Sequence, residues 1–537
     1  MKHCAHEVRS SKSPNSGFLA AMLGVCTVVA VICSGGVASQ GATDLIWPTN
    51  GWLTSTPEEQ GVDSKELTNL VNFGATHHLD SLLLVRHGKI VAEVYYAPYS
   101  EGILHEVNST TKAVIGTLIA VAWKDGLLDN PNHPALDFFD KSKVTDAYDG
   151  KVAITVQNLL DMTSGFEWNE GLDGPNISSH AMEYCPNWVD FILDRPMSNF
   201  PGEVFYYNSG NTHLLSAIIT KLSGMPALEY AQAKLFGPLG IDHVFWRNDP
   251  QGISVGGYDL FLEPRDMAKI GYLYLRDGVW EGRQMLPAAW IHKVNHATID
   301  MHAAWEPGLR YANLFWALPE KHVYMSVGYH GQVIMVFPDL DVVAVTTARD
   351  NYSFSKFADL VSNSVKSDTV QPAVSTKVLA DKILEVSTEK SAGAGPIPAI
   401  ATFVSGKVYQ FAPNELNIKS VSLILTGPKP KYEIETYPSE TSKIGPKIIG
   451  PIGLNGAYQK ARLTYHGFIR EGFEGLPRVN AVKGTWQDDH TFVAEWLRLG
   501  LGQPLERWKF TFSGNQLNVL VDFSADHVIF ISSETSG

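Results

Sequence analysis

Cysteine is scarce in this sequence, and its distribution excludes a disulfide-stabilised scaffold. Only four cysteines occur among 537 residues. Three of them, Cys4, Cys26 and Cys33, lie near the N-terminus, so only Cys185 would remain after removal of a leader. One cysteine forms neither an intrachain disulfide nor a cysteine metal site. We therefore expect a protein that depends on a large hydrophobic core, with Cys185 as an ordinary buried or half-buried thiol.

Positive charge is also in short supply, and recognisable metal or cofactor motifs are missing from the sequence. Lysine and arginine number 42 against 56 aspartates and glutamates, whereas a nucleic-acid-binding protein usually has a basic patch. The 18 histidines form no HExxH pair, and His105-Glu106 has no second histidine at the right spacing. Gly256-Gly257-Tyr258 is too short for a dinucleotide fingerprint. We expect no nucleic-acid partner, no metal and no cofactor.

The N-terminal segment has the pattern of a secretory signal peptide, assigned here to residues 1–39. Basic residues precede an apolar run at residues 17–33, and small residues follow it. Cleavage is expected after Ala38 or Ser39, which would place the protein in the periplasm or outside the cell. The alternative is an uncleaved anchor, because the apolar run is roughly long enough to span a bilayer. Only that alternative gives the protein a membrane partner.

Residues 44–365 alternate apolar strand-like runs with helical periodicity. Two strand hairpins are predicted there, at residues 81–96 and 333–347. Helices are predicted between the hairpins, at residues 109–124, 156–162 and 212–222. Strand pairs at both ends with helices between them indicate an α+β domain, built on one antiparallel sheet that carries helices.

The composition changes after this domain. Residues 366–400 are rich in Ser, Thr, Lys, Ala, Gly and Pro, which is typical of a linker, with room for one short helix. Residues 401–537 contain short alternating runs separated by turn residues. This pattern predicts a smaller all-β domain, either a sandwich or a barrel.

The pattern most relevant to chemistry is Asn108-Ser109-Thr110-Thr111-Lys112 at the head of an apolar helix. Residues three apart share one face of a helix, so the side chains of Ser109 and Lys112 can meet. A serine hydroxyl needs a neighbouring base to become a nucleophile, and a buried lysine loses its proton more readily than a solvated one. Taken alone, the pattern also fits an N-cap serine followed by a solvated lysine.

Two downstream segments, LLDMTSG at residues 159–165 and PGEVFYYNS at residues 201–209, give the S-x-x-K pattern a context. In this order and spacing, the three motifs resemble the β-lactamase-related serine hydrolases, over roughly residues 50–365. That family includes class C β-lactamases, D-alanyl-D-alanine carboxypeptidases, esterases and 6-aminohexanoate-dimer hydrolases. The resemblance implies a β-lactamase/transpeptidase-like domain that needs no cofactor.

The resemblance also implies roles for individual residues. Ser109 matches the acylated serine, Lys112 the lysine of its motif and Tyr207 the family tyrosine, which shuttles protons. Ser209 takes the place of the Asn or Ser that follows the tyrosine and is expected to contact substrate. Tyr206 would replace Tyr207 if the alignment were shifted by one residue; otherwise we expect it to pack. Either Lys112 or Tyr207 takes the Ser109 proton, and the sequence leaves both possibilities open.

The third family motif is altered here. Its Lys-Thr-Gly position falls on Ser326-Val327-Gly328, so the lysine that helps to hold a substrate carboxylate is missing. Gly328 would let substrate lie along the strand edge, and the N–H groups of Tyr329 and Ser109 would form the oxyanion hole. His330 is either a replacement cation or a rim residue. The departure favours an amidase or esterase over a β-lactamase or carboxypeptidase.

Several alternatives remain at this point. We expect a small-molecule amide or ester as substrate, and the rival hypothesis is a non-catalytic sensor or binding protein on the same fold. Trp305 and Trp316 would either line the cleft or pack. The C-terminal domain resembles an accessory domain found behind some of these hydrolases, with the likeness at residues 483–492. It would cap the active site, form a homodimer or bind a surface polymer.

Overall fold

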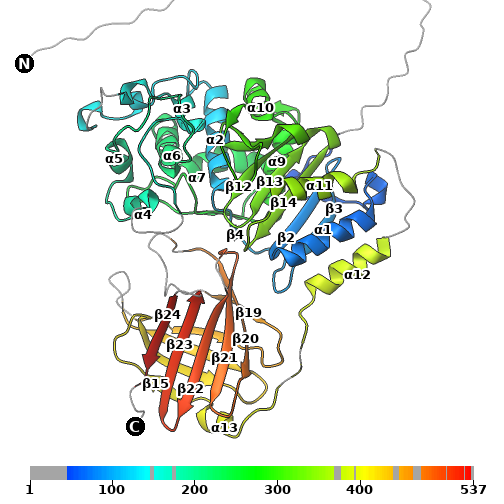
Figure 1. Ribbon diagram of the computed structural model, residues 1–537, viewed down its shortest axis with the longest axis vertical. Helices are drawn as coiled ribbons and strands as arrows, with labels where there is room; N and C mark the ends of the chain where they lie inside the picture. The colour runs from blue at the N-terminus through cyan, green and yellow to red at the C-terminus, as the bar shows by residue number, and fades with distance from the viewer. Residues whose placement is uncertain are drawn as a thin grey trace, which may run out of the picture. The chain divides into compact units, whose positions relative to one another are not determined.

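The computed structural model describes most of the chain after residue 44. The described residues are 45–144, 150–171, 177–367, 376–391, 393, 395–438, 445, 447–463, 473, 475–502, 505–524 and 527–533. The predicted signal peptide, residues 1–39, lies outside them. Residues 46–537 form one compact unit. This unit contains a nine-stranded region, residues 46–365, and a C-terminal β region, residues 401–533 (Figure 1).

The nine-stranded sheet has the order β1-β3-β2-β14-β13-β12-β11-β10-β9. Its strands are β1 (Leu53–Thr54), β2 (Leu79–Arg86), β3 (Lys89–Tyr95), β9 (Ile299–Asp300), β10 (Arg310–Ala312), β11 (Phe315–Leu318), β12 (Val323–Gly328), β13 (Gln332–Phe337) and β14 (Val342–Ala348). Both predicted hairpins are confirmed, as β2–β3 and β13–β14. The expectation of a purely antiparallel sheet is wrong at one edge, because the two-residue strand β1 runs parallel to β3.

Helices surround this sheet. They are α1 (Ser64–Thr76), α2 (Thr110–Lys124), α3 (Val156–Leu160), α4 (Ser178–Glu183), α5 (Trp188–Leu193), α6 (Ser209–Ser223), α7 (Ala227–Ala231), α8 (Gly237–Leu239), α9 (Pro264–Leu275), α10 (Ala288–Asn295) and α11 (Phe354–Ser364). Figure 1 shows α1 and α11 on one side of the sheet and α2, α3 and α6 on the other. The predicted α+β class is therefore confirmed for this region.

The central strands are buried on both faces, which explains their continuous apolar sequence. Every residue of β12, β13 and β14 is buried. Successive side chains of a strand point to opposite faces. In β13, Ile334 and Val336 join the core that contains α2 and α9, whereas Val333 and Met335 join the core under α1 and α11. The sheet is thus the middle layer of three.

A small three-stranded sheet places the start of α2. Its strands are β4 (His105–Glu106), β5 (Phe245–Trp246) and β6 (Leu260–Leu262), in the order β4-β6-β5. The Val107 N–H donates to the Leu260 carbonyl at 2.9 Å. The chain that leads into α2 is therefore fixed against the segment that precedes α9. A separate hairpin joins β7 (Val279–Trp280) and β8 (Arg283–Gln284).

The segment between the two regions is partly helical. Helix α12 (Thr376–Ser387) contacts α1, and its Leu379 is buried in the core under that helix. A further short helix, α13 (Ile400–Val404), precedes the C-terminal strands. The sequence left room for one short helix here, and α12 is a helix of three turns that packs on the nine-stranded region.

The C-terminal β region contains two antiparallel sheets. One consists of β15 (Val408–Gln410), β16 (Ile418–Ile424), β17 (Lys431–Thr436) and β18 (Lys447–Pro451). The other consists of β19 (Gln459–Leu463), β20 (Arg478–Trp486), β21 (Thr491–Leu499), β22 (Glu506–Ser513), β23 (Gln516–Ser524) and β24 (His527–Ser532). Residues of both sheets, such as Ile434 and Phe510, share one core. The predicted all-β class is confirmed.

One turn of the C-terminal β region contacts the nine-stranded region near α2. This turn, Gly500–Gly502, follows β21. The Glu106 N–H donates to the Gly500 carbonyl at 2.6 Å, and His330 Nδ1 lies 3.4 Å from the Gly502 carbonyl oxygen. Gly500 also lies so close to Leu104 that a Cβ there would be 1.9 Å from the Leu104 carbonyl oxygen.

Candidate active site

Ser109 stands at the N-cap of α2, but its side chain does not cap the helix. The neighbouring Thr110 is fully buried, and its hydroxyl donates to the Gln332 carbonyl at 2.8 Å. Thr110 therefore fixes the first turn of α2 to β13. Because the capping role is unused, the Ser109 hydroxyl is available for other contacts. It lines two cavities, described below.

Lys112 reaches back along α2 to Ser109. Its Nζ donates to Ser109 Oγ at 2.9 Å and to the Gly257 carbonyl at 2.8 Å. The side chain is 1% exposed, so the alternative of a solvated lysine is wrong. Burial lowers the pKa of Lys112 to about 8, and the Glu170 carboxylate opposes that shift. A lysine with this pKa is partly neutral at physiological pH, as a general base must be.

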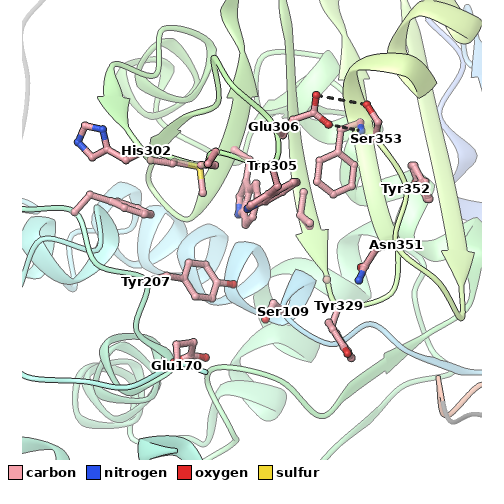
Figure 2. A pocket seen from close by; sticks show the side chains of 18 residues that line it. Ser109, Glu170, Tyr207, His302, Trp305, Glu306, Tyr329, Asn351, Tyr352 and Ser353 are labelled. Atoms are coloured by element: carbon pink, nitrogen blue, oxygen red, sulfur yellow. Dashed lines mark hydrogen bonds between the residues drawn. The ribbon is translucent and has the colours of Figure 1, made fainter. Parts of the chain in front are cut away.

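Tyr207 lies beside both Ser109 and Lys112. Its hydroxyl interacts with the Ser109 side chain, and its ring centroid lies 4.9 Å from Lys112 Nζ. Burial raises the pKa of Tyr207, so the phenol stays protonated at neutral pH. Tyr206, the alternative, is exposed and lines neither of the two cavities. The structure thus brings Ser109, Lys112 and Tyr207 together, and Figure 2 shows Tyr207 beside Ser109.

Glu170 is a functional candidate that sequence reasoning missed. It lines both cavities and accepts hydrogen bonds from the backbone N–H of Ser209 at 2.9 Å, from the Ser209 hydroxyl and from the Trp168 indole. Ser209 is 1% exposed, so its hydroxyl is held by Glu170 at the wall of the smaller cavity. No motif marks Glu170, because its contacts with Ser209 form only when residues 39 positions apart fold together.

The altered third motif lies at the end of β12. Gly328 and Tyr329 line the larger cavity, whereas Ser326 is buried and contacts the Thr110 hydroxyl at 3.3 Å. A Cβ on Gly328 would lie 2.2 Å from the Val107 carbonyl oxygen, so only glycine allows this approach. The Asn108 side-chain amide also donates to the Tyr329 carbonyl at 3.2 Å. These contacts hold β12 against the start of α2, where the expected oxyanion donors lie.

His330 does not supply a cation to this site. It lines neither cavity, and burial lowers its pKa, so the ring is neutral at physiological pH. Its ring stacks on Tyr329 with centroids 3.7 Å apart. The position therefore supports a packing role at the rim.

A buried polar chain holds the carbonyl that Lys112 contacts. The Gly256 N–H donates to His213 Nδ1 at 3.4 Å, and His213 Nε2 lies 3.0 Å from an Asp249 carboxylate oxygen. His213 is fully buried on α6, and Asp249 is 5% exposed. Because Nδ1 accepts from Gly256, Nε2 bears the proton that Asp249 accepts. Sequence reasoning dismissed Gly256-Gly257 and did not single out His213.

The larger cavity that Ser109 lines has a volume of about 880 Å³. Its lining is mainly aromatic and apolar: Phe205, Tyr207, Met301, Ala303, Ala304, Trp305, Trp316, Val327, Tyr329, Tyr352 and Phe354. Polar lining residues include His302, Glu306, Asn351 and Ser353. Trp305 and Trp316 therefore both line the cavity, which was one of the two alternatives predicted for them, the other being packing. Figure 2 shows Trp305 across the cavity from Ser109.

The smaller cavity has a volume of about 220 Å³ and is polar. Its lining contains four carboxylates, those of Glu106, Glu170, Glu183 and Asp259. Asp259 and Glu183 face Arg247, at 2.9 and 3.8 Å. Ser109 is thus placed between an aromatic and an acidic space.

In the part of the chain that the structure describes, no cluster of three or more His, Cys, Asp or Glu side chains could hold a metal ion. No helix among the same residues is long and apolar enough to cross a membrane.

Comparison with known proteins gives one family match and several relatives. A family model described as Beta-lactamase matches residues 75–362, more than half of the chain. The 6-aminohexanoate-dimer hydrolase of Paenarthrobacter ureafaciens is 24% identical over 285 residues, which are 50% of this chain and 71% of the relative. Penicillin-binding protein 4* of Bacillus subtilis strain 168 is 25% identical over 139 residues, 24% of this chain and 31% of the relative.

Solved structures to which the chain is similar include EstCE1, a hydrolase with promiscuous acyltransferase activity. It is 14% identical with a TM-score of 0.48, over 57% of this chain and 98% of that chain. The octameric penicillin-binding protein homologue from Pyrococcus abyssi is 15% identical with a TM-score of 0.46, over 88% of this chain and 99% of that chain.

Proposed function

Because the chain belongs to the beta-lactamase family, we propose that it is a serine hydrolase that cleaves an amide or ester bond of a small molecule through an acyl-enzyme on Ser109. The observation that supports this most strongly is the buried Lys112 Nζ, 2.9 Å from Ser109 Oγ. Burial beside the serine lowers the pKa of this lysine, which suits a proton acceptor.

In the first step, the neutral Lys112 takes the proton of Ser109, directly or through the Tyr207 hydroxyl, while Oγ attacks the substrate carbonyl carbon. The negative charge on the carbonyl oxygen is stabilised by the N–H groups of Ser109 and Tyr329. Lys112, directly or through the Tyr207 hydroxyl, then returns the proton to the leaving amine or alcohol as the amide or ester bond breaks. Each oxyanion donor is worth about 3 kcal/mol in the transition state.

In the second step, a water molecule attacks the acyl carbon, and the same groups take and return its proton, which frees Ser109. The raised pKa of Tyr207 favours the phenol as a proton relay. Lys112, with a pKa of about 8, is therefore the proposed base. Amide or ester cleavage is proposed over β-lactam hydrolysis because Ser326 stands where a lysine would bind a substrate carboxylate.

A fluorophosphonate probe tests this proposal. Intact-mass analysis of the protein exposed to the probe should show one adduct, and peptide mapping should place it on Ser109. The adduct should be lost in Ser109→Ala and strongly slowed in Lys112→Ala. A folded protein that forms no adduct would contradict the proposal and favour the sensor hypothesis.

We also propose that the protein is exported, on the pattern of residues 1–39. Expression with its own leader in a bacterial host, followed by fractionation and N-terminal sequencing, tests this. A mature N-terminus near Gln40 or Ser39 in the periplasm or medium supports cleavage. Full-length protein in the membrane fraction would support the anchor, and full-length protein in the cytoplasm would contradict both.

A further inference from the structure

A continuous aromatic surface extends from the reacting groups to the mouth of the larger cavity. The Tyr207 ring lies 6.1 Å from the Trp316 ring, centroid to centroid. Trp316 lies 5.8 Å from Trp305, and Trp305 lies 5.8 Å from Phe354. An apolar group held on this surface would therefore have its scissile bond within reach of Ser109.

Trp305 is the exposed member of this surface. It retains 61% exposure, whereas Phe354 is 5% exposed. Tryptophan offers a large apolar area and one hydrogen-bond donor, and leaving it in water is unfavourable unless a ligand covers it. The exposed Trp305 ring thus marks an apolar surface that a bound substrate would cover.

The position of Trp305 is fixed before substrate arrives. The next residue, Glu306, is 7% exposed and accepts a hydrogen bond from the Phe354 N–H at 3.0 Å, with the Ser353 hydroxyl at 3.5 Å (Figure 2). These contacts join the Trp305 segment to the N-terminus of α11. A preformed wall binds substrate at a smaller entropic cost than a mobile one.

Charge around Ser109 selects against anions. Among the described residues that line the larger and the smaller cavity, none is lysine or arginine. Five of these residues are carboxylic acids: Glu106, Glu170, Glu183, Asp259 and Glu306. A substrate carboxylate in either cavity would therefore meet like charge, which costs affinity in a partly desolvated site. The nearby cations are already engaged: Lys112 donates to Ser109 and Gly257, and Arg247 faces two of the carboxylates.

We propose that the larger cavity binds a bulky, uncharged aromatic or apolar group of the substrate, and that Trp305 is the residue that selects it. The substrate class is then aryl-bearing esters or amides without a carboxylate near the scissile bond. A cavity of about 880 Å³ accommodates a group of this size. The inference rests on the proposed function, because it assumes that Ser109 is the nucleophile.

Four esters of similar intrinsic reactivity test the proposal by pH-stat: ethyl acetate, benzyl acetate, ethyl phenylacetate and benzyl phenylacetate. We expect at least one single-phenyl ester to have a kcat/KM about tenfold or more above ethyl acetate, mainly through KM. The single-phenyl ester with the higher kcat/KM identifies whether the acyl or the alcohol group occupies the cavity. Ethyl 4-carboxyphenylacetate should have a kcat/KM at least about tenfold below ethyl phenylacetate.

Two variants assign the selection to Trp305. Trp305→Ala should abolish the phenyl preference, and Trp305→Phe should restore part of it. Phe530→Ala is the matched control, because Phe530 is 60% exposed on β24 and lines neither cavity. It should leave all four esters unchanged.

The results separate the two proposals. Equal kcat/KM values for the four esters, or an unaltered phenyl preference in Trp305→Ala, would overturn the inference while turnover and the Ser109 adduct keep the proposed function intact. Faster hydrolysis of the carboxylate ester would also overturn it. Absence of both turnover and adduct would instead overturn the proposed function on which it rests.

Discussion

The nine-stranded region and the C-terminal β region bury their sheets in different ways. Strands β12, β13 and β14 are buried along their whole length, because helices cover both faces of their sheet. Strand β17 alternates buried with half-buried residues, and β22 alternates buried with mostly exposed ones. Each C-terminal sheet therefore has one face in the shared core and one face toward water.

This difference decides where chemistry can be placed. In the nine-stranded region, the end of β12 meets the N-terminus of α2 in an interior dry enough to lower the pKa of Lys112. Among the described residues of the C-terminal β region, the only helix is the five-residue α13, which contains neither serine nor lysine. The C-terminal β region contacts the site through the turn Gly500–Gly502 and through Phe473, whose ring lies 5.3 Å from the Arg247 guanidinium. The first region should therefore supply the reacting groups and the second should at most position them.

The largest effect is expected at Lys112. Lys112→Met removes the proposed base and should lower kcat/KM by about 10³-fold or more. Lys431→Met, at a partly exposed lysine of β17 paired with Glu433, is the matched control and should leave kcat/KM unchanged. Steady-state kinetics on a responsive ester measures both. Comparable losses in the two variants would contradict the division between the regions.

Lys112→Met should also change how the stability of the protein depends on pH. The folded pKa of Lys112, about 8, lies below the ordinary lysine value of 10.5, so the unfolded chain binds more protons between these two pH values. The free energy of unfolding of the wild-type protein should therefore rise between about pH 8 and 10.5 because of Lys112. The Lys112→Met variant should lack this rise. Calorimetric Tm values at pH 7.5 and 10 check this. An identical pH dependence in both proteins would argue against a buried, titrating Lys112.

A pH profile gives the next largest effect. If neutral Lys112 is the base, kcat/KM should rise about tenfold per pH unit below about 8 and level off above it. Tyr207 should add no rise in this range, because burial raises its pKa. Measured kcat/KM values from pH 6 to 9 check this, and a profile already flat at pH 6 would remove Lys112 from the role of base.

The residues of the site also differ in whether the sequence alone could predict them. Ser109, Lys112 and Tyr207 belong to short motifs whose spacing is set by one helix or one turn, and the two hairpins follow from alternation and turn residues. Glu170, Gly257 and His213 belong to no such pattern. Their roles come from contacts between distant segments, such as Glu170 with Ser209 and Gly257 with Lys112.

The edge of the nine-stranded sheet also could not be predicted from local sequence patterns. Strand β1 has two residues and pairs with β3 in parallel, a register that depends on the path of the whole chain. Helix α12 lies in a segment whose composition is that of a linker, yet it packs on α1. Local sequence predicts local structure, whereas the partner of a short strand or helix is a tertiary property.

A smaller effect is expected from the buried chain behind Lys112. His213→Gln should weaken the hold on Gly256 and let the Gly257 carbonyl shift away from Lys112 Nζ. We expect kcat to fall about tenfold and the acidic limb of the pH profile to move, with KM nearly constant. His133→Gln, on a surface loop next to Asp129, should change neither. A loss of activity with an unmoved pH profile would indicate a purely structural role.

The smallest effect is expected where the C-terminal β region contacts the site. Gly500 and Gly514 both occupy turns with positive φ, 82° and 58°, so alanine strains both turns in the same way. Only Gly500 abuts the nine-stranded region, since a Cβ there would be 1.9 Å from the Leu104 carbonyl oxygen, whereas a Cβ on Gly514 would meet nothing within 4 Å. Gly500→Ala should therefore displace the turn from Glu106 and His330 and lower kcat/KM about threefold to tenfold. Gly514→Ala should cost only stability, measured as Tm. Equal kinetics in the two variants would mean that the turn Gly500–Gly502 does not position the site.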